Sequence, residues 1–280
     1  MKLSIIVVTT DRLPLTRRLF ASLAAQSCNT FDVVFVHGPA VAAAARELAE
    51  SFPGLDITIL QSRDVCLSRS RNLALASVTG DIIAFADDDC VYEPDTVAEA
   101  LAAFEKHRTT HVIMGRSVDI DEAVTPTPGH PMQLNRYSVF KGCPTYVHFY
   151  RLEVVRTVGH YDEHLGPGCD TPFMGGEETD YALRALEMGF SIVRIPTVLV
   201  RHPSVMLRSP KLKMKVAAYA AGRMRLLRKH NFPWWFLAAN VLYPLLRLPL
   251  DCLAECILLS RYRYAMFTSR LKWTLKAVVR

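Results

Sequence analysis

The sequence lacks the marks of a secreted protein. Its seven cysteines are scattered, odd in number and without a Cys-x-x-Cys pair. This pattern argues against a disulfide framework and predicts reduced thiols in a cytosolic protein. The first eight residues, MKLSIIVV, have neither the longer apolar segment nor the small-residue cleavage site of a signal peptide. We expect them to form a strand.

The sequence also has no clean membrane span. Residues 234–246, WWFLAANVLYPLL, form an uncharged run of 13 residues that includes Asn240 and Pro244. A membrane-spanning helix needs about 20 apolar residues, and Arg247 follows at once. We therefore expect this segment not to cross a bilayer.

Acidic residues are scarce at the end of the chain. Residues 201–280 hold 16 Lys and Arg but two acids, whereas residues 1–200 hold 17 bases and 25 acids. Such a basic tail on an acidic body is typical of contact with a polyanion. No nucleic-acid recognition motif accompanies the charge, and aromatic and leucine residues beside Lys and Arg fit an interfacial helix on an anionic membrane. The alternatives are a tail packed on the catalytic domain, an oligomer contact, or a solvated helical face.

Strands and helices alternate over the first half of the chain. Apolar runs predict strands at 3–9, 31–36, 57–60 and 81–86, and helical spacing predicts helices at 12–26, 41–50, 68–77 and 94–106. Further along, the pattern predicts a strand at 111–118, a strand leading into a helix at 146–158, a helix at 177–188 and a strand at 192–200. This alternation predicts an α/β fold, with a mostly parallel sheet flanked by helices. Ligands of such sheets bind at the C-terminal strand ends.

Three adjacent aspartates, Asp87, Asp88 and Asp89, follow the apolar strand at 81–86. Carboxylates this close repel one another, so a cation is expected beside them. Mg²⁺ or Mn²⁺ is commonly held by one or two carboxylates together with substrate phosphates. A solvated loop or an N-cap cluster is the alternative, but the position at a strand end favours a metal–phosphate site.

A second acidic cluster, Glu177, Glu178 and Asp180, opens the helix at 177–188. Acids are ordinary in a first helical turn, where the helix dipole favours them. Here they follow Gly175-Gly176 and the glycine- and proline-rich segment 166–176, and such segments often act as active-site lids. A carboxylate at the edge of such a loop is suited to the role of general base.

These motifs, taken in order, resemble those of the family 2 glycosyltransferases, which have the GT-A fold. The matching stretches are SIIVVTTDR (4–12), LSRSRNLALASVTGDIIAFADDD (67–89), VGHYDEHLG (158–166), GGEETDYALRALEMG (175–189) and RHP (201–203). The resemblance covers residues 4–205. It implies a GT-A catalytic domain at 1–205, with a nucleotide-sugar half at 1–110 and an acceptor half at 111–205, followed by a basic helical tail at 206–280.

The resemblance also implies an activity: inverting transfer of a sugar from a nucleotide-sugar to an acceptor hydroxyl, with a divalent cation (Mn²⁺ or Mg²⁺) at the donor diphosphate. The triplet resembles the DXD motif of the family. Asp89 is then the metal ligand, Asp87 and Asp88 contact the ribose or the metal, and His202 adds a metal contact.

The remaining roles follow from the same resemblance. Glu178 matches the acid that usually serves as the base, with Glu177 and Asp180 as alternatives. The matches that line the nucleotide are Thr9, Asp11, Asp64 and Arg71. His37-Gly38-Pro39 stands where the family usually has an acid pair that reads the base, so UDP is taken as the default because it is common in the family.

The basic tail suggests where in the cell this activity takes place. A tail docked on the cytoplasmic leaflet would bring the site to a lipid-linked acceptor, in cell-surface polysaccharide or glycolipid synthesis. A catalytically silent sugar-nucleotide or membrane-binding scaffold is one alternative, although a silent copy has no chemical need for both acidic clusters. A nucleotidyltransferase is another, but it would need a glycine-rich basic loop after the first strand, and TTDRLPL contains no glycine. Acceptor choice is expected to depend on residues 125–150 and 166–176.

Overall fold

The structure is a computed structural model that describes residues 1–123, 130–141, 144–203, 212–253 and 257–276. Its contacts divide the chain into two compact units. The sheet unit comprises Met1–Tyr161 and Tyr181–Ser204, and the helical unit comprises Asp162–Asp180 and Val205–Arg280. Residues 162–180, which the sequence-based division placed in the catalytic domain, thus group with the C-terminal helices.

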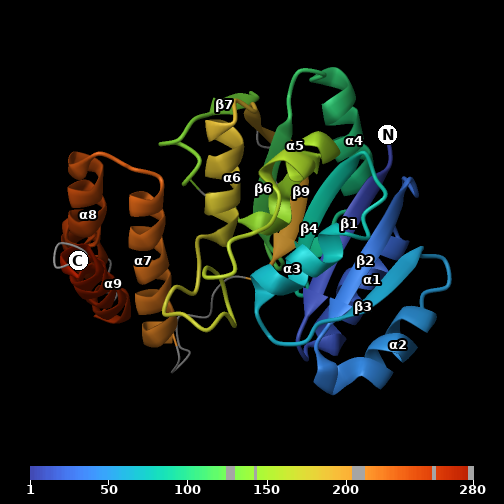
Figure 1. Cartoon of the computed structure of the whole chain (residues 1–280), viewed down its shortest axis with the longest axis horizontal. Helices are drawn as coiled ribbons and strands as arrows, with labels where there is room; N and C mark the ends of the chain where they lie inside the picture. The colour runs from blue at the N-terminus through green and yellow to red at the C-terminus, as the bar shows by residue number, and fades with distance from the viewer. Residues whose placement is uncertain (124–129, 142–143, 204–211, 254–256, 277–280) are drawn as a thin grey trace. The chain divides into compact units, whose positions relative to one another are not determined.

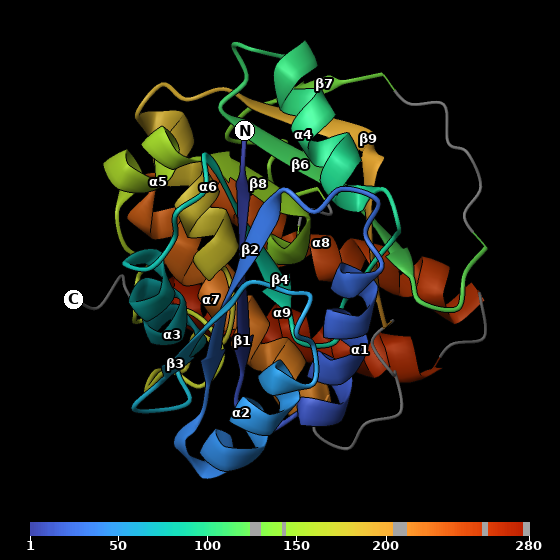
Figure 2. The ribbon, with the colours of Figure 1, turned by 90° about the vertical axis from the view of Figure 1, so that its right-hand side faces the viewer.

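Within the part of the chain that the structure describes, a nine-stranded sheet organises the sheet unit (Figures 1 and 2). Four neighbouring strands are parallel, in the order β3 (Ile57–Gln61), β2 (Phe31–His37), β1 (Leu3–Thr9) and β4 (Ile82–Asp87). Their carboxyl ends therefore lie at one edge of the sheet. The predicted strands at 3–9, 31–36, 57–60 and 81–86 are confirmed to within one residue at each end.

The rest of the sheet mixes strand directions. Its strands are β8 (His148–Arg151), β6 (Val112–Asp119), β9 (Ile192–His202) and β5 (Val91–Tyr92), with β7 (Met132–Leu134) also on β9. β8 is antiparallel to both β4 and β6, and β6 is parallel to β9. The sequence pattern does not predict β5 and β7, because two or three residues are too few for a recognisable apolar run.

Helices cover both faces of this sheet. They are α1 (Leu13–Ala24), α2 (Ala42–Glu50), α3 (Leu67–Leu75), α4 (Thr96–Lys106) and α5 (Leu152–Val158), with short 3₁₀ turns at Pro39–Val41 and Thr145–Val147. One core contains alternate residues of β1, β2 and β4 packed against α1, α2 and α4. The opposite face carries an aromatic cluster of Phe85, Tyr150, Tyr161 and Tyr181. Burial on both faces explains why these strands are continuously apolar.

The helical unit contains α7 (Leu212–Lys229), α8 (Trp234–Leu253) and α9 (Ile257–Leu275), and α6 (Glu177–Glu187) begins in it. α9 packs against both α7 and α8. Among the described residues, no helix is both long enough and apolar enough to span a bilayer. Residues 206–211, the start of the predicted basic helical tail at 206–280, lie outside the described residues. So do 125–129 and 142–143 of the segment 125–150, which is expected to influence acceptor choice.

The prediction of reduced thiols is wrong for two cysteines. Cys66 and Cys169 are disulfide-bonded, whereas Cys28 and Cys90 are free thiols. Spacing along the sequence could not reveal this, because disulfide bonding depends on distance in the folded chain.

Candidate active site

The carboxyl ends of β1 and β4 bring polar side chains together. Thr9, the last residue of β1, donates a hydrogen bond through Oγ1 to Asp88 Oδ2 at 2.6 Å. Asp88 follows β4 directly and is 2% exposed. Burial raises the pKa of Asp88 to about 6, although the Thr9 hydroxyl and the Arg12 guanidinium act in the opposite direction. The strand-end cluster predicted from the sequence therefore exists.

Arg12 bridges two of the three aspartates. Its Nη1 lies 2.7 Å from Asp89 Oδ2, its Nε donates to Asp88 Oδ2 at 3.1 Å, and its Nη2 pairs with Asp88 Oδ1. Half of the Arg12 side chain is exposed. A solvent-accessible guanidinium thus supplies part of the positive charge that the triplet requires.

Asp89 lies between Arg12 and His202. The Nε2 atom of His202 is 3.1 Å from Asp89 Oδ1. Burial disfavours ionisation of Asp89, but His202 and Arg12 outweigh it and lower its pKa to about 2. Burial likewise lowers the pKa of His202, but Asp89 outweighs that effect and the net shift is upward. Asp89 is therefore a carboxylate at neutral pH.

Neighbouring groups fix the ring of His202. Its Nδ1 lies 2.8 Å from the Pro203 carbonyl oxygen, so Nδ1 carries the proton. The ring stacks on Tyr146 with centroids 4.5 Å apart and planes 2° apart, and the Tyr146 hydroxyl lies 2.8 Å from Ser117 Oγ. Such contacts orient metal-ligating histidines and leave Nε2 as the ligand atom.

Asp87, Asp89 and His202 form a group that could hold a metal ion. Each offers one ligand atom, and these atoms lie within 4.8 Å of one another. Two carboxylates and an imidazole suit Mn²⁺ well, and Mg²⁺ less well because it prefers oxygen ligands. The residues therefore fit the cation that the sequence predicts.

Asp87 is tied to the nucleotide-binding candidate Arg71. Arg71 Nη2 lies 3.2 Å from Asp87 Oδ1, and the Arg71 side chain is 3% exposed. Its guanidinium lies over the rings of Phe85 and Tyr161, at 5.8 and 5.4 Å from their centroids. Arg71, which lies on α3, thus orients Asp87.

The other nucleotide-binding candidates lie at the same sheet edge but outside this cluster. Asp64 follows β3, accepts a hydrogen bond from Cys66 N and pairs with Arg69 at 2.7 Å. Asp11 is exposed and accepts a hydrogen bond from Thr10 Oγ1. His37, where the family usually has an acid, is buried and bonds to the Gly38 carbonyl oxygen.

The second acidic cluster lies in the helical unit, at the start of α6. Asp180 is fully buried and pairs with two consecutive residues from the end of α7: Lys229 Nζ at 2.7 Å and His230 Nε2 at 2.9 Å. Lys229 Nζ also pairs with Asp162 at 2.6 Å. We call Lys229 and His230 the α7 clamp. Sequence analysis missed it because its members lie about 50 residues beyond Asp180.

Glu177 and Glu178 have different surroundings from each other. Glu177 is buried, and Glu178 is half-buried. Burial and the nearby Arg270 lower the pKa of Arg223, whereas the Glu178 carboxylate raises it. Glu178 is therefore the more accessible of the two glutamates and faces a cation from α7.

The glycines before these acids allow α7 to approach. A Cβ on Gly222 of α7 would lie 2.1 Å from the Gly175 carbonyl oxygen, and a Cβ on Gly175 would lie 2.2 Å from the Tyr219 ring. Gly176 has a φ of +100°, which L side chains rarely adopt. The glycine pair, interpreted from sequence as a lid element, thus forms a tight backbone contact with α7.

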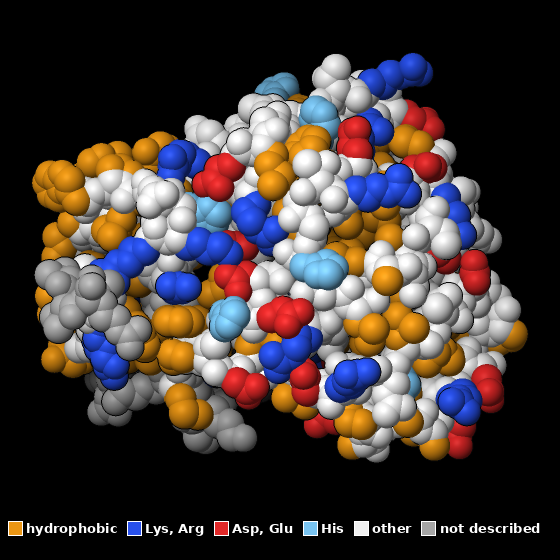
Figure 3. Space-filling view, in the orientation of Figure 1, with side chains coloured by type: hydrophobic (Ala, Val, Ile, Leu, Met, Phe, Trp, Pro, Cys, Tyr) orange, Lys and Arg blue, Asp and Glu red, His pale blue; other side chains and the backbone are white. Residues whose placement is uncertain are grey.

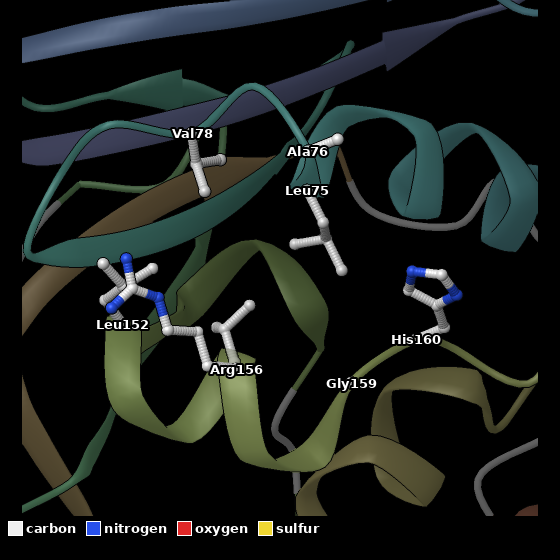
Figure 4. Close-up of a pocket in the computed structure, with 8 residues that line it drawn as sticks. Leu75, Ala76, Val78, Leu152, Arg156, Gly159 and His160 are labelled. Carbon is white, nitrogen blue, oxygen red and sulfur yellow. The ribbon is translucent and has the colours of Figure 1, made fainter.

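A pocket in the sheet unit includes no residue of either acidic cluster. It has a volume of about 360 Å³ and is lined by residues of α3 and α5 and the segments that follow them, including Leu75, Val78, Leu152 and His160 (Figure 4). None of the predicted site residues lines it. Its lining is largely apolar, and it offers no acidic cluster.

The sequence matches the model of glycosyl transferase family 2 over residues 4–158. The chain belongs to this family. The matched region includes the β1 and β4 strand ends and all three aspartates of the triplet. No curated protein matches the sequence.

Solved structures share the fold of this chain. S. aureus TarS 1–349 superposes with a TM-score of 0.63 at 14% identity, over 97% of this chain and 92% of TarS 1–349. The mannosyltransferase PcManGT from Pyrobaculum calidifontis, in complex with GDP-Man and Mn²⁺, superposes with a TM-score of 0.64 at 15% identity, over 99% and 75% of the two chains. TarS 1–349 has also been solved with UDP-GlcNAc. The predicted GT-A fold is thus confirmed, and the family match makes the chain a glycosyltransferase.

Proposed function

We propose that this glycosyltransferase is metal-dependent and inverting, with Asp87, Asp89 and His202 as the metal-binding group. The observation that carries the proposal is the convergence of these three ligand atoms at the carboxyl ends of the strands, in a member of glycosyl transferase family 2. A divalent cation there would act as a Lewis acid on the departing nucleotide diphosphate. Mn²⁺ is also the cation present with GDP-Man in PcManGT.

The sheet unit would bind the donor through its strand ends. Thr9, Asp11, Asp64, Arg71 and Asp88 line the edge where nucleotides bind in such sheets. A UDP-sugar is the default donor, and UDP-GlcNAc in TarS is compatible with it. GDP-Man in PcManGT makes a guanosine donor the first alternative to test.

Arg12 is a further residue of this cluster, one to which the sequence motifs assign no role. Its guanidinium occupies the acidic cluster through contacts to Asp88 and Asp89 while remaining half exposed. We propose that it balances these carboxylates and presents a cation to the donor phosphates, since Arg forms strong charge-assisted bonds with phosphate oxygens.

Glu178 is the candidate base, and the surroundings of the three acids support that choice. Asp180 is fully buried and held by the α7 clamp, so its role would be to fix the first turn of α6. Glu177 is buried, whereas Glu178 is accessible. Glu178 would take the proton from the acceptor hydroxyl as that oxygen attacks, and a base in this position typically contributes 10²- to 10⁴-fold, in order of magnitude.

We further propose a peripheral position on the inner face of the cytoplasmic membrane, with a lipid-linked acceptor in polysaccharide or glycolipid synthesis. The basic composition of residues 201–280 supports it. The silent scaffold remains the competing function, and hydrolysis of the donor in the absence of acceptor separates the two, because a scaffold has no turnover.

The deciding experiment is a thermal-shift screen with nucleoside diphosphates and nucleotide-sugars, each with and without Mn²⁺ or Mg²⁺. A ligand that binds the native state raises the melting temperature. We expect a metal-dependent shift with one nucleotide that is lost in Asp89→Ala. Asp56→Ala, an exposed carboxylate before β3, is the matched control and should respond as wild type. No shift with any nucleotide would contradict the proposal.

A further inference from the structure

Helix α8 exposes an apolar stripe. Its members recur with helical spacing and are Trp235, Ala239, Leu242, Tyr243 and Leu246; we call them the α8 stripe. All five are exposed, including Trp235 at 51% and Leu246 at 72%, and the preceding Trp234 is exposed at 81%. Residues with this spacing share one side of a helix. Figure 3 shows hydrophobic side chains gathered at the left margin, over α8.

The opposite side of α8 already packs within the helical unit. Val241 is buried there, and Asn240 accepts hydrogen bonds from Arg223 of α7 at 3.1 Å and from Arg270 of α9 at 2.5 Å. A surface helix normally turns its polar residues outward. In α8 the outer side is apolar, so the stripe contributes little to folding, and an exposed apolar patch of this kind marks an interaction surface.

Exposed basic side chains also lie on α8 and on α9, which packs against it. Arg247 follows Leu246 on α8, and Lys272 and Lys276 are exposed on α9 beside Leu271 and Leu275. From residue 205 to the end, the sequence contains two acids, Asp251 and Glu255. Tryptophan, tyrosine and leucine beside Lys and Arg match the boundary between anionic headgroups and acyl chains.

The charge argues against a second copy of the chain as the occupant. Two helical units joined through their stripes would bring two strongly basic surfaces together, and like charges disfavour such an interface. An anionic bilayer, by contrast, offers apolar material for the stripe and negative charge for the surrounding lysines and arginines. We propose that the α8 stripe inserts into the headgroup region of an anionic membrane, with α8 lying along the surface.

This inference deepens the membrane-associated part of the proposed function and does not depend on donor chemistry. Its test is co-sedimentation of the full chain with phosphatidylcholine vesicles, with and without phosphatidylglycerol, at low and high salt. Wild type is expected to bind the anionic vesicles, and to bind them more weakly at high salt because screening weakens the contact with the lipid charge. Emission from Trp234 and Trp235 should shift to the blue on binding.

Two variants separate the stripe from net charge. Leu246→Glu places a charge in the stripe, and Met214→Glu makes the same charge change at a methionine of α7 that is 68% exposed. Leu246→Glu should weaken vesicle binding by about tenfold or more, from the lost burial of one leucine. Met214→Glu should weaken it clearly less.

Three results would overturn the inference. Wild type could fail to bind anionic vesicles at low salt, the two glutamate variants could lose binding equally, or Leu246→Glu could dissociate a dimer seen by light scattering without changing vesicle binding. The nucleotide thermal-shift response of the same preparations distinguishes failure here from failure of the donor site. Vesicle binding without any nucleotide response would uphold the stripe and contradict the donor proposal.

Discussion

The two acidic clusters neutralise their charges in different ways. In the sheet unit, Asp88 and Asp89 are paired with the half-exposed Arg12. In the helical unit, Asp180 is fully buried and held by the α7 clamp. A carboxylate whose balancing charge is accessible can exchange that partner for a ligand, whereas one buried between a lysine and a histidine cannot. The comparison separates acids that can bind a ligand from acids that stabilise the fold.

The largest expected effect comes from Asp89. Its charge is stabilised by Arg12 and His202, and we propose it as a metal ligand. Asp89→Asn preserves the shape but removes the charge, and should lower the turnover of nucleotide-sugar by roughly 10³-fold or more, because several kcal/mol of charge stabilisation depend on a bound cation. Steady-state kinetics across a Mn²⁺ titration measure it. A variant with near-wild-type turnover would remove Asp89 from the site.

Next in size is the loss expected on changing the base. Glu178→Gln should reduce kcat by about 10²- to 10⁴-fold while leaving the metal-dependent thermal shift with the donor intact. Glu177→Gln is the matched control, since it makes the same change one residue away. If Glu177→Gln loses more turnover than Glu178→Gln, the assignment of the base between these two residues is reversed.

The α7 clamp should govern stability more than donor binding. His230→Ala leaves the buried Asp180 carboxylate without one of its two partners, and leaving a buried charged group short of a hydrogen-bond partner costs roughly 3 kcal/mol. Urea unfolding measures the loss. Asp180→Asn in the same background should recover part of it, because no buried charge then remains. Equal stabilities of His230→Ala and wild type would show that the clamp carries no net energy.

The sequence predicted the first cluster better than the second, for a physical reason. Asp87, Asp88 and Asp89 end a buried strand, so alternation along the chain and the geometry of parallel sheets placed them at the ligand edge. Asp180, Lys229 and Asp162 are joined across the helical unit, and their contacts depend on how α7 packs against the segment 162–180. The local sequence pattern does not determine how α7 packs against this segment. The contact between Gly175 and Gly222 likewise depends on the position of α7, so the sequence alone did not reveal it.

The same distinction explains why the contacts of Arg12 could not be predicted from the sequence. Its position after β1 was visible in the sequence, but its pairing partners lie 76 and 77 residues further along. A basic residue at the start of a helix has no local reason to be there, since the helix dipole disfavours it. The unfavourable position of the Arg12 charge at the start of a helix was the signal in the sequence that this residue has an acidic partner.

A smaller effect is expected from Arg12→Gln. Without the guanidinium, Asp88 and Asp89 lose a balancing charge, so the ligand-free protein should unfold at a lower temperature. The cation should then stabilise the variant more than wild type, because it restores more of the missing charge. Melting curves with and without Mn²⁺ measure both effects. An identical Mn²⁺ shift in the two proteins would show that Arg12 does not balance the metal-binding acids.

The smallest effect concerns the pH dependence of the stability that the pair between Lys229 and Asp162 contributes. Burial raises the pKa of Asp162, but the hydrogen bond from Lys229 outweighs it, with help from the His164 backbone N–H, and the net pKa is lowered. A carboxylate whose folded-state pKa is lowered contributes stability above its unfolded pKa, about 3.9, and loses it as pH falls through the folded value. Lys229→Met should therefore be less stable than wild type near neutral pH.

The gap between the two proteins should narrow as pH falls below about 4 and through the lowered folded-state pKa of Asp162, below which Asp162 is protonated in both. For the Asp162 pair, which is partly exposed, the contribution is expected to be about 0.5 to 1 kcal/mol. Urea unfolding from neutral to acidic pH measures it, with Lys215→Met, an exposed lysine on α7, as the control for loss of one positive charge. A gap that stayed constant with pH would mean that Lys229 stabilises the unit through its pair with the buried Asp180 or through packing of its aliphatic stem, and not through its pair with Asp162.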